Sequence, residues 1–194
     1  MIRRLLLAAS LVLAQPLSAL AAPVTVAGIK YEDTTQVGNS KLVLNGAGLR
    51  SKAIFKVYTA ALYLPAKATT PDAVIAQPGA KRMHIVMLRE INAAELGKLF
   101  ARGMEDNAPR DEFSKSVAGV LTMSDIFFQY KKLSAGEYFT ADWVPGTGTV
   151  ISVNGKPAGQ PIKEPEFYSA LLKIWLGKAP ADTLLKEGLL GHLD

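Results

Sequence analysis

The chain contains no cysteine and only two histidines, His84 and His192. Without cysteine it can form no disulfide, no thiol nucleophile and no thiolate metal site. Neither histidine has an acidic residue or another histidine at the spacing of a metal-binding motif, so we expect no metal ion and no other cofactor. His84 falls in an alternating apolar segment, where a histidine is more often a packed side chain than a catalytic base.

Several catalytic and binding motifs are also missing. No G-x-S-x-G sequence is present, so a serine hydrolase of that type would lack its nucleophile. Residues 146–148 read GTG, but no helix is expected after them, and a phosphate site of that kind needs a helix N-terminus. The 22 Lys and Arg and the 17 Asp and Glu are spread along the chain without a block of like charge. Nucleic acid is therefore not an expected partner.

The first 21 residues have the pattern of a secretory signal peptide. Basic residues at positions 3 and 4 precede an apolar run at 5–13, and Ala19-Leu20-Ala21 is a small-x-small cleavage site. The run is too short for a membrane span, and its flanks argue against the alternative of a buried N-terminal helix. We therefore expect export to the periplasm, cleavage near Ala21 and no transmembrane segment afterwards. Arg3 and Arg4 would leave with the peptide, which lowers the formal net charge from +5 to +3.

The remaining residues, 22–194, are long enough for one domain with its own hydrophobic core. Residues 53–64 form an apolar run with few polar residues at either the odd or the even positions. This pattern predicts a strand covered on both faces, in the centre of a sheet. Gly46 and Gly48 permit unusual backbone angles, so we expect a turn or bulge that interrupts the strand before it. Asn154-Gly155 predicts a tight hairpin with a type I′ turn.

Hydrophobic periodicity and capping residues locate the other elements. Further strands are expected near residues 24–31, 42–44, 82–88, 137–143, 149–153 and 156–160. Helices are expected at 71–76, at 92–106, around 113–124, from 165 to a cap at 177, and from 180 onward. Strands joined by hairpins, with helices grouped in the middle and at the end, indicate an α+β domain.

Arg50 is the charged residue that fits this pattern least, because it directly precedes the apolar strand. A guanidinium there must meet a partner or reach water. If it points inward, its planar donors form a site suited to a carboxylate, and Tyr58 on the same parity could add a neutral donor. An apolar cleft with these two groups at one end suits a fatty acid or another amphipathic acid. The alternative is that Arg50 reaches solvent while Tyr58 packs in the core.

Several segments together resemble the chalcone isomerase-like family, especially its bacterial secreted branch. They are GAGLR at 46–50, KVYTAALY at 56–63, GTGTVISVNGKPAG at 146–159, EFYSALLKIWLG at 166–177 and LLKEGLLG at 184–191. The resemblance covers nearly all of the expected mature chain. It implies a chalcone isomerase-like fold: a large, mostly antiparallel sheet packed on one face by a layer of helices, with a ligand cleft between the layers.

The resemblance also implies roles for particular residues. In family members that bind fatty acids, an arginine after the Gly-x-Gly element and a tyrosine in the next strand hold the ligand carboxylate, and Arg50 and Tyr58 match these positions. Eight residues of straight strand span about 26 Å, so the two can cooperate only if the chain bends sharply or Arg50 curls back. A threonine of the enzymes falls at the position of Tyr58, and Thr59 next to it would match with an offset of one residue. The expected cleft walls are Leu62, Leu96, Leu99 and Phe100.

The enzymes of the family also use a tyrosine from the helix that corresponds to 92–106. The inner face of that helix offers Leu96, Leu99 and Gly103 here, without a tyrosine. We therefore expect a periplasmic, non-catalytic protein that binds an amphipathic carboxylate such as a fatty acid, with no catalytic residues. The alternatives are an isomerase or lyase acting on a chalcone-like phenolic substrate, and a partner-binding module of the cell envelope.

Overall fold

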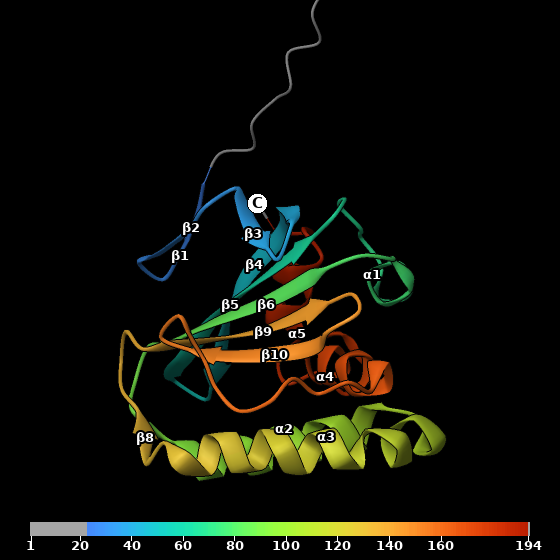
Figure 1. Cartoon of the computed structure of the whole chain (residues 1–194). Helices are drawn as coiled ribbons and strands as arrows, with labels where there is room; N and C mark the ends of the chain where they lie inside the picture. Colours follow the sequence, from blue (N-terminus) through green and yellow to red (C-terminus); the bar gives the residue numbers. More distant parts are fainter. Residues whose placement is uncertain (1–22, 194) are drawn as a thin grey trace, which may run out of the picture.

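The computed structural model describes residues 23–193, and the predicted signal peptide lies outside them. A seven-stranded antiparallel sheet with the order β11-β10-β9-β6-β5-β4-β3 forms the body of the domain, and helices cover one of its faces (Figure 1). The strands are β1 (Val24–Val26), β2 (Ile29–Tyr31), β3 (Thr34–Val37), β4 (Ser40–Lys52), β5 (Phe55–Leu64), β6 (Lys81–Met87), β7 (Ile91–Asn92), β8 (Lys132–Leu133), β9 (Tyr138–Val144), β10 (Gly148–Val153) and β11 (Lys156–Pro157). The helices are α1 (Pro71–Ala76), α2 (Ala93–Asn107), α3 (Arg110–Gln129), α4 (Pro165–Leu176) and α5 (Thr183–Leu189). The α+β class predicted from the sequence is confirmed.

Strand β5 lies inside the sheet between β4 and β6, as its two apolar faces predict. On one face, Tyr58, Leu62 and Leu64 join the main core, which lies between the sheet and the helices. On the other face, Ala61 and Tyr63 join a smaller core with residues of β2, β3 and β4. Burial on both sides is the reason that this segment has almost no polar residues.

The predicted turn at Gly46 and Gly48 is wrong, because β4 continues through both glycines. The pairing of β4 with β5 shifts register between Leu44 and Gly46, so the predicted bulge is present. The chain reverses only at residues 53–54. The glycines instead allow α5 to lie against the strand. A Cβ on Gly46 would collide with the backbone carbonyl of Gly188, and one on Gly48 would lie 2.9 Å from the Leu185 side chain.

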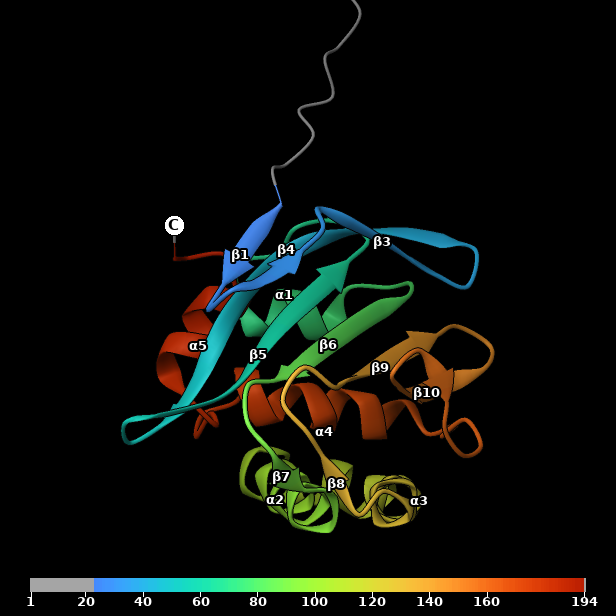
Figure 2. The same cartoon turned by 90° about the vertical axis from the view of Figure 1, so that its left-hand side faces the viewer.

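The helices form two tiers beneath the sheet. Figure 2 shows α4 between the sheet and the antiparallel pair α2 and α3. Helix α4 is buried on most of its surface, and its Trp175 meets Phe100 of α2 edge to face at a ring-centroid distance of 5.4 Å. Phe100 also contacts Phe139 of β9 at 5.7 Å, so aromatic side chains connect the sheet to both tiers.

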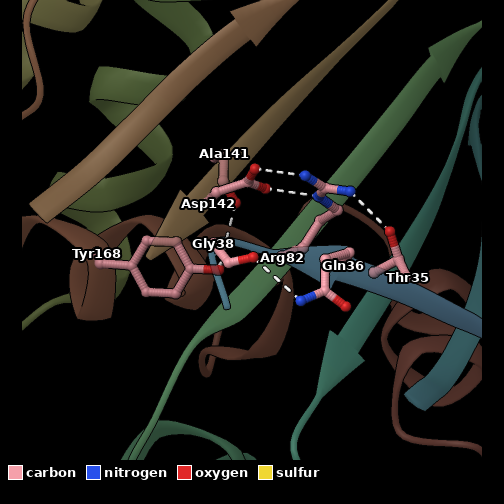
Figure 3. Close-up of polar contacts among 7 residues, drawn as sticks. All are labelled: Thr35, Gln36, Gly38, Arg82, Ala141, Asp142 and Tyr168. Atoms are coloured by element: carbon pink, nitrogen blue, oxygen red, sulfur yellow. Dashed lines mark hydrogen bonds and ion pairs between the residues drawn. The ribbon is translucent and has the colours of Figure 1, made fainter. Parts of the chain in front are cut away.

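An ion pair on the other face holds the sheet in a strong curl. Arg82 of β6 donates two hydrogen bonds to the carboxylate of Asp142 on β9, at 2.7 and 2.6 Å, and a third to the Thr35 hydroxyl at 2.7 Å (Figure 3). Thr35 belongs to β3, at the far edge of the sheet beyond β5 and β4. One side chain can reach both strands only because the sheet bends back on itself.

Candidate ligand-binding cavity

A cavity of about 530 Å³ opens where the β4–β5 hairpin meets α2. The hairpin and α2 supply most of the lining, and α4 and the segment before α5 add to it. The lining residues are Arg50, Lys52, Phe55, Val57, Tyr58, Arg89, Glu90, Ile91, Asn92, Glu95, Leu96, Leu99, Phe100, Arg102, Gly103, Asp106, Ile174, Ala179 and Ala181. Both charged and apolar side chains contribute to this lining.

Arg50 and Tyr58 lie side by side in this cavity. They are directly opposite each other in the pairing of β4 with β5, because the chain reverses between them at residues 53–54. The expected difficulty of a straight 26 Å strand therefore does not arise. Directly opposed residues have Cβ atoms about 5 Å apart, which is close enough for both side chains to reach one carboxylate.

Arg50 is largely but not completely enclosed, with one quarter of its side chain exposed. Its Nη1 lies 3.6 Å from the Asp182 carboxylate and donates a hydrogen bond to the carbonyl of Ser51. The Asp182 carboxylate also accepts hydrogen bonds from the backbone N–H of Ser51 at 3.0 Å and of Leu185 at 3.1 Å, as the N-cap of α5. A guanidinium has five N–H donors, so this pairing leaves capacity for a further anion.

Tyr58 provides a neutral hydroxyl beside this charge. Its oxygen accepts a hydrogen bond of 2.9 Å from the indole N–H of Trp175. Burial raises the pKa of Tyr58 to about 12, although the Trp175 hydrogen bond and the Arg50 charge act to lower it. The phenol is therefore protonated at neutral pH, and because its oxygen is already an acceptor, its O–H can donate into the cavity.

The structure gathers five of the seven residues that the sequence singled out. Leu96, Leu99 and Phe100 line the cavity together with Arg50 and Tyr58. Leu96 and Phe100 are buried, whereas Leu99 is half-exposed at the side of the cavity.

Thr59 and Leu62 are not part of the lining. Thr59 points to the opposite face of the sheet, where its hydroxyl is 2.7 Å from that of Tyr31. The alternation of side chains along β5 makes this unavoidable if Tyr58 faces the helices. Leu62 shares the face of Tyr58 but is fully buried in the main core, four residues further along the strand.

Sequence reasoning did not find Asp182, Trp175 or Ile174 as members of this site. Asp182 had a usable signal, because an aspartate just before a helical segment is a typical N-cap. Its contact with Arg50, more than 130 residues earlier in the chain, could not be read from the sequence. Trp175 and Ile174 were expected only on the apolar face of their helix, and which neighbour each meets depends on how that helix lies under the sheet.

A second hollow of about 310 Å³ lies on the outer face of the sheet and contains His84. The imidazole packs between the rings of Tyr31 and Tyr138, at centroid distances of 5.5 and 5.1 Å. Burial and the nearby Arg82 charge lower the pKa of His84 to about 4, so the ring is neutral at pH 7. Within residues 23–193, no group of three or more His, Cys, Asp or Glu is placed to hold a metal ion.

The comparisons with known proteins agree with this architecture. A family model described as chalcone isomerase-like matches residues 23–191. The chain belongs to the chalcone isomerase-like family. A crystal structure of a fatty-acid binding protein from Arabidopsis thaliana matches with a TM-score of 0.66 at 16% identity, over 87% of this chain and 95% of that one. No curated protein matches the chain in sequence.

The chalcone isomerase-like fold predicted from the sequence is thus confirmed, with the cavity between the sheet and the helices. In this chalcone isomerase-like domain, α2 presents Leu96, Leu99, Phe100 and Gly103 to the cavity. No helix in the described part of the chain is long and apolar enough to cross a membrane.

Proposed function

We propose that this protein binds a fatty acid or a similar amphipathic carboxylate in the cavity, without catalysing a reaction on it. The observation that carries the proposal is the pair formed by Arg50 and Tyr58, which lie directly opposite each other on β4 and β5 in the lining of the cavity. A guanidinium and a protonated phenol in these positions offer a carboxylate one charged and one neutral donor. The Arabidopsis fatty-acid binding protein of the same fold supports this choice of ligand class.

The wall of the cavity suits the rest of such a ligand. Val57, Leu96, Phe100 and Ile174 give an apolar surface next to the two donors. A volume of about 530 Å³ falls within the range of about 300–1,000 Å³ that is usual for small-molecule sites. Burial of a methylene group contributes about 0.8 kcal/mol, so the alkyl chain would supply most of the affinity and the donors would fix its direction.

Asp182 affects the charge that Arg50 presents to a ligand. Before a ligand enters, its carboxylate compensates part of the Arg50 charge, which would otherwise be costly to enclose. The pair is 3.6 Å apart and the Asp182 carboxylate is also held by two backbone N–H groups. Arg50 can therefore turn its remaining donors to a ligand without leaving Asp182 unpaired.

We also propose that the protein acts in the periplasm. The support is the N-terminal sequence alone: a basic start, an apolar run and a small-x-small site that ends at Ala21. Cell fractionation and the N-terminal mass of the purified protein test this directly. A mature chain that begins near residue 22 in the periplasmic fraction is expected, and an uncleaved chain in the cytoplasm would contradict it.

Native mass spectrometry of the mature protein tests the binding proposal. We expect the wild-type protein to carry a copurified fatty acid, or to take up an added one, and Arg50→Gln to lose it. Lys52→Gln is the matched control, since it removes a positive charge from the same cavity at an exposed position of the hairpin. A wild-type protein that does not bind added fatty acid, or an equal loss of binding in both variants, would contradict the proposal. Absorbance loss with a chalcone would contradict its non-catalytic part.

A further inference from the structure

The tip of the β4–β5 hairpin exposes two large apolar side chains next to each other. Ile54 is 89% exposed and Phe55 is 54% exposed. Figure 2 shows this end of the hairpin reaching past α5 and α2, away from the body of the domain. Within residues 23–193, Ile54 is left almost uncovered and Phe55 only partly covered. Exposed neighbouring apolar residues at a projecting tip mark an interaction surface more often than a single exposed residue does.

The charged residues of the hairpin tip itself are all basic. Lys52 and Lys56 flank the apolar pair and are themselves exposed. Arg89, on the segment after β6, places its guanidinium 5.0 Å from the centre of the Phe55 ring. Residues 50–58 contain no Asp or Glu. These five residues, Lys52, Ile54, Phe55, Lys56 and Arg89, are called the basic tip below.

Glu95 and Asp106 of α2 line the cavity together with Lys52 and Arg89, whereas the two acidic residues next to the tip in the fold, Glu90 and Asp182, have partners outside it. Glu90 follows Arg89 in the chain, but its carboxylate lies 2.6 Å from the ammonium group of Lys132. Asp182 is held by Arg50 and by the backbone N–H groups of Ser51 and Leu185. The basic tip therefore presents three positive charges around an apolar centre.

We infer that the basic tip docks on an anionic phospholipid membrane. Ile54 and Phe55 would enter the boundary between headgroups and acyl chains, while Lys52, Lys56 and Arg89 would contact phosphate groups. Long basic side chains suit such a position, because their aliphatic stems lie along apolar surface while their charges stay in the headgroup layer. A protein partner would need a matching acidic rim around an apolar pocket, whereas an anionic bilayer provides both features without any further specificity.

The position of the basic tip relative to the cavity suggests a purpose for this docking. Lys52, Phe55 and Arg89 line the cavity as well as the tip. A docked tip would thus hold the cavity mouth against the lipid surface, where an amphipathic acid could pass between bilayer and protein. This step rests on the proposed function, but the docking does not.

Sedimentation with lipid vesicles tests the inference, using the mature protein without added fatty acid. We expect binding to vesicles of phosphatidylglycerol mixed with phosphatidylcholine, and at least tenfold weaker binding to phosphatidylcholine alone, because each basic residue near an anionic surface contributes roughly a fivefold change. The variant Ile54→Ser/Phe55→Ser should bind the anionic vesicles at least about tenfold more weakly. Lys52→Gln/Lys56→Gln should do the same and should also lose most of its dependence on salt.

Val117→Ser/Leu121→Ser is the matched control. It removes two exposed apolar side chains, 41% and 62% exposed, from one face of α3, and it should keep wild-type binding. Equal binding to neutral and anionic vesicles, or an equal loss in the control, would overturn the inference. So would a dimer in sedimentation velocity that Ile54→Ser/Phe55→Ser abolishes, since the tip would then meet a second copy. Because the assay measures attachment to vesicles and not occupancy of the cavity, failure here leaves the cavity proposal standing, and failure of fatty-acid binding leaves this result unchanged.

Discussion

Asp182→Asn should strengthen the binding of a fatty acid. The Asp182 carboxylate, 3.6 Å from Arg50 Nη1, would repel a ligand carboxylate bound to the remaining donors of the same guanidinium. Asparagine removes the repelling charge but keeps a side-chain oxygen that can accept from the N–H of Leu185, so α5 retains its N-cap. The substitution also removes the acceptor of the Ser51 N–H, so it combines the lost charge with the loss of one hydrogen bond.

The size of the effect follows from the geometry. A ligand carboxylate on the far side of the guanidinium would lie about 6 Å from Asp182, where two like charges repel by about 0.7 to 2.8 kcal/mol for an effective dielectric constant between 80 and 20. Arg50 and Asp182 are partly exposed, at 25% and 15%, which favours the middle of this range. We expect affinity to rise by roughly tenfold, which corresponds to about 1.4 kcal/mol. Stability should fall by about 1 kcal/mol without ligand, because Arg50 loses its partner.

Titration calorimetry at low ionic strength, with a fatty acid below its micelle concentration, measures this change. Glu95→Gln is the control, because it removes one negative charge from the cavity on the side of α2. It should change affinity by much less than Asp182→Asn does. Weaker binding in Asp182→Asn, or no change while Arg50→Gln abolishes binding, would refute the idea that Asp182 repels the ligand carboxylate.

Three further predictions concern stability. Gly46→Ala should lower the free energy of unfolding by at least about 2 kcal/mol in urea denaturation, because the new Cβ meets the rigid backbone of Gly188; an unchanged midpoint would show that α5 can move away. Trp175→Phe should cost about 2 kcal/mol, since the buried Tyr58 hydroxyl loses its donor, and should weaken fatty-acid binding. For His84, the unfolded pKa of about 6.5 exceeds the folded value of about 4, so stability should fall by up to about 3 kcal/mol as the pH drops from 6.5 to 4. His84→Gln should remove this part of the pH dependence, and an unaltered profile would contradict the assignment.

Much of the fold could be predicted from the sequence because local signals and burial agree. Asn154 and Gly155 both have positive φ, at 49° and 77°, as the expected type I′ turn requires. Asn92 caps α2 through the N–H of Glu95, and Pro165 is the first residue of α4. In each case the signal depends on a few adjacent residues, so no distant contact was needed to interpret it.

The errors and omissions have a common cause, which is contact between distant segments. Gly46 and Gly48 were interpreted as turn residues, but in the structure their lack of a Cβ allows α5 to pack closely against the strand. The reversal at residues 53–54, where Ala53 has a φ of 52°, carries no strong turn sequence, and it is what brings Arg50 beside Tyr58. The resemblance to known proteins identified this pair, whereas the reason that they can act together became visible only in the structure.

A structure of the protein with a bound saturated fatty acid tests the central claim most directly. We predict a carboxylate within hydrogen-bond distance of the Arg50 guanidinium and the Tyr58 hydroxyl, with the alkyl chain along Leu96 and Phe100. A fatty acid bound in the outer hollow beside His84, or one that lies in the cavity with its carboxylate away from Arg50 and Tyr58, would contradict it.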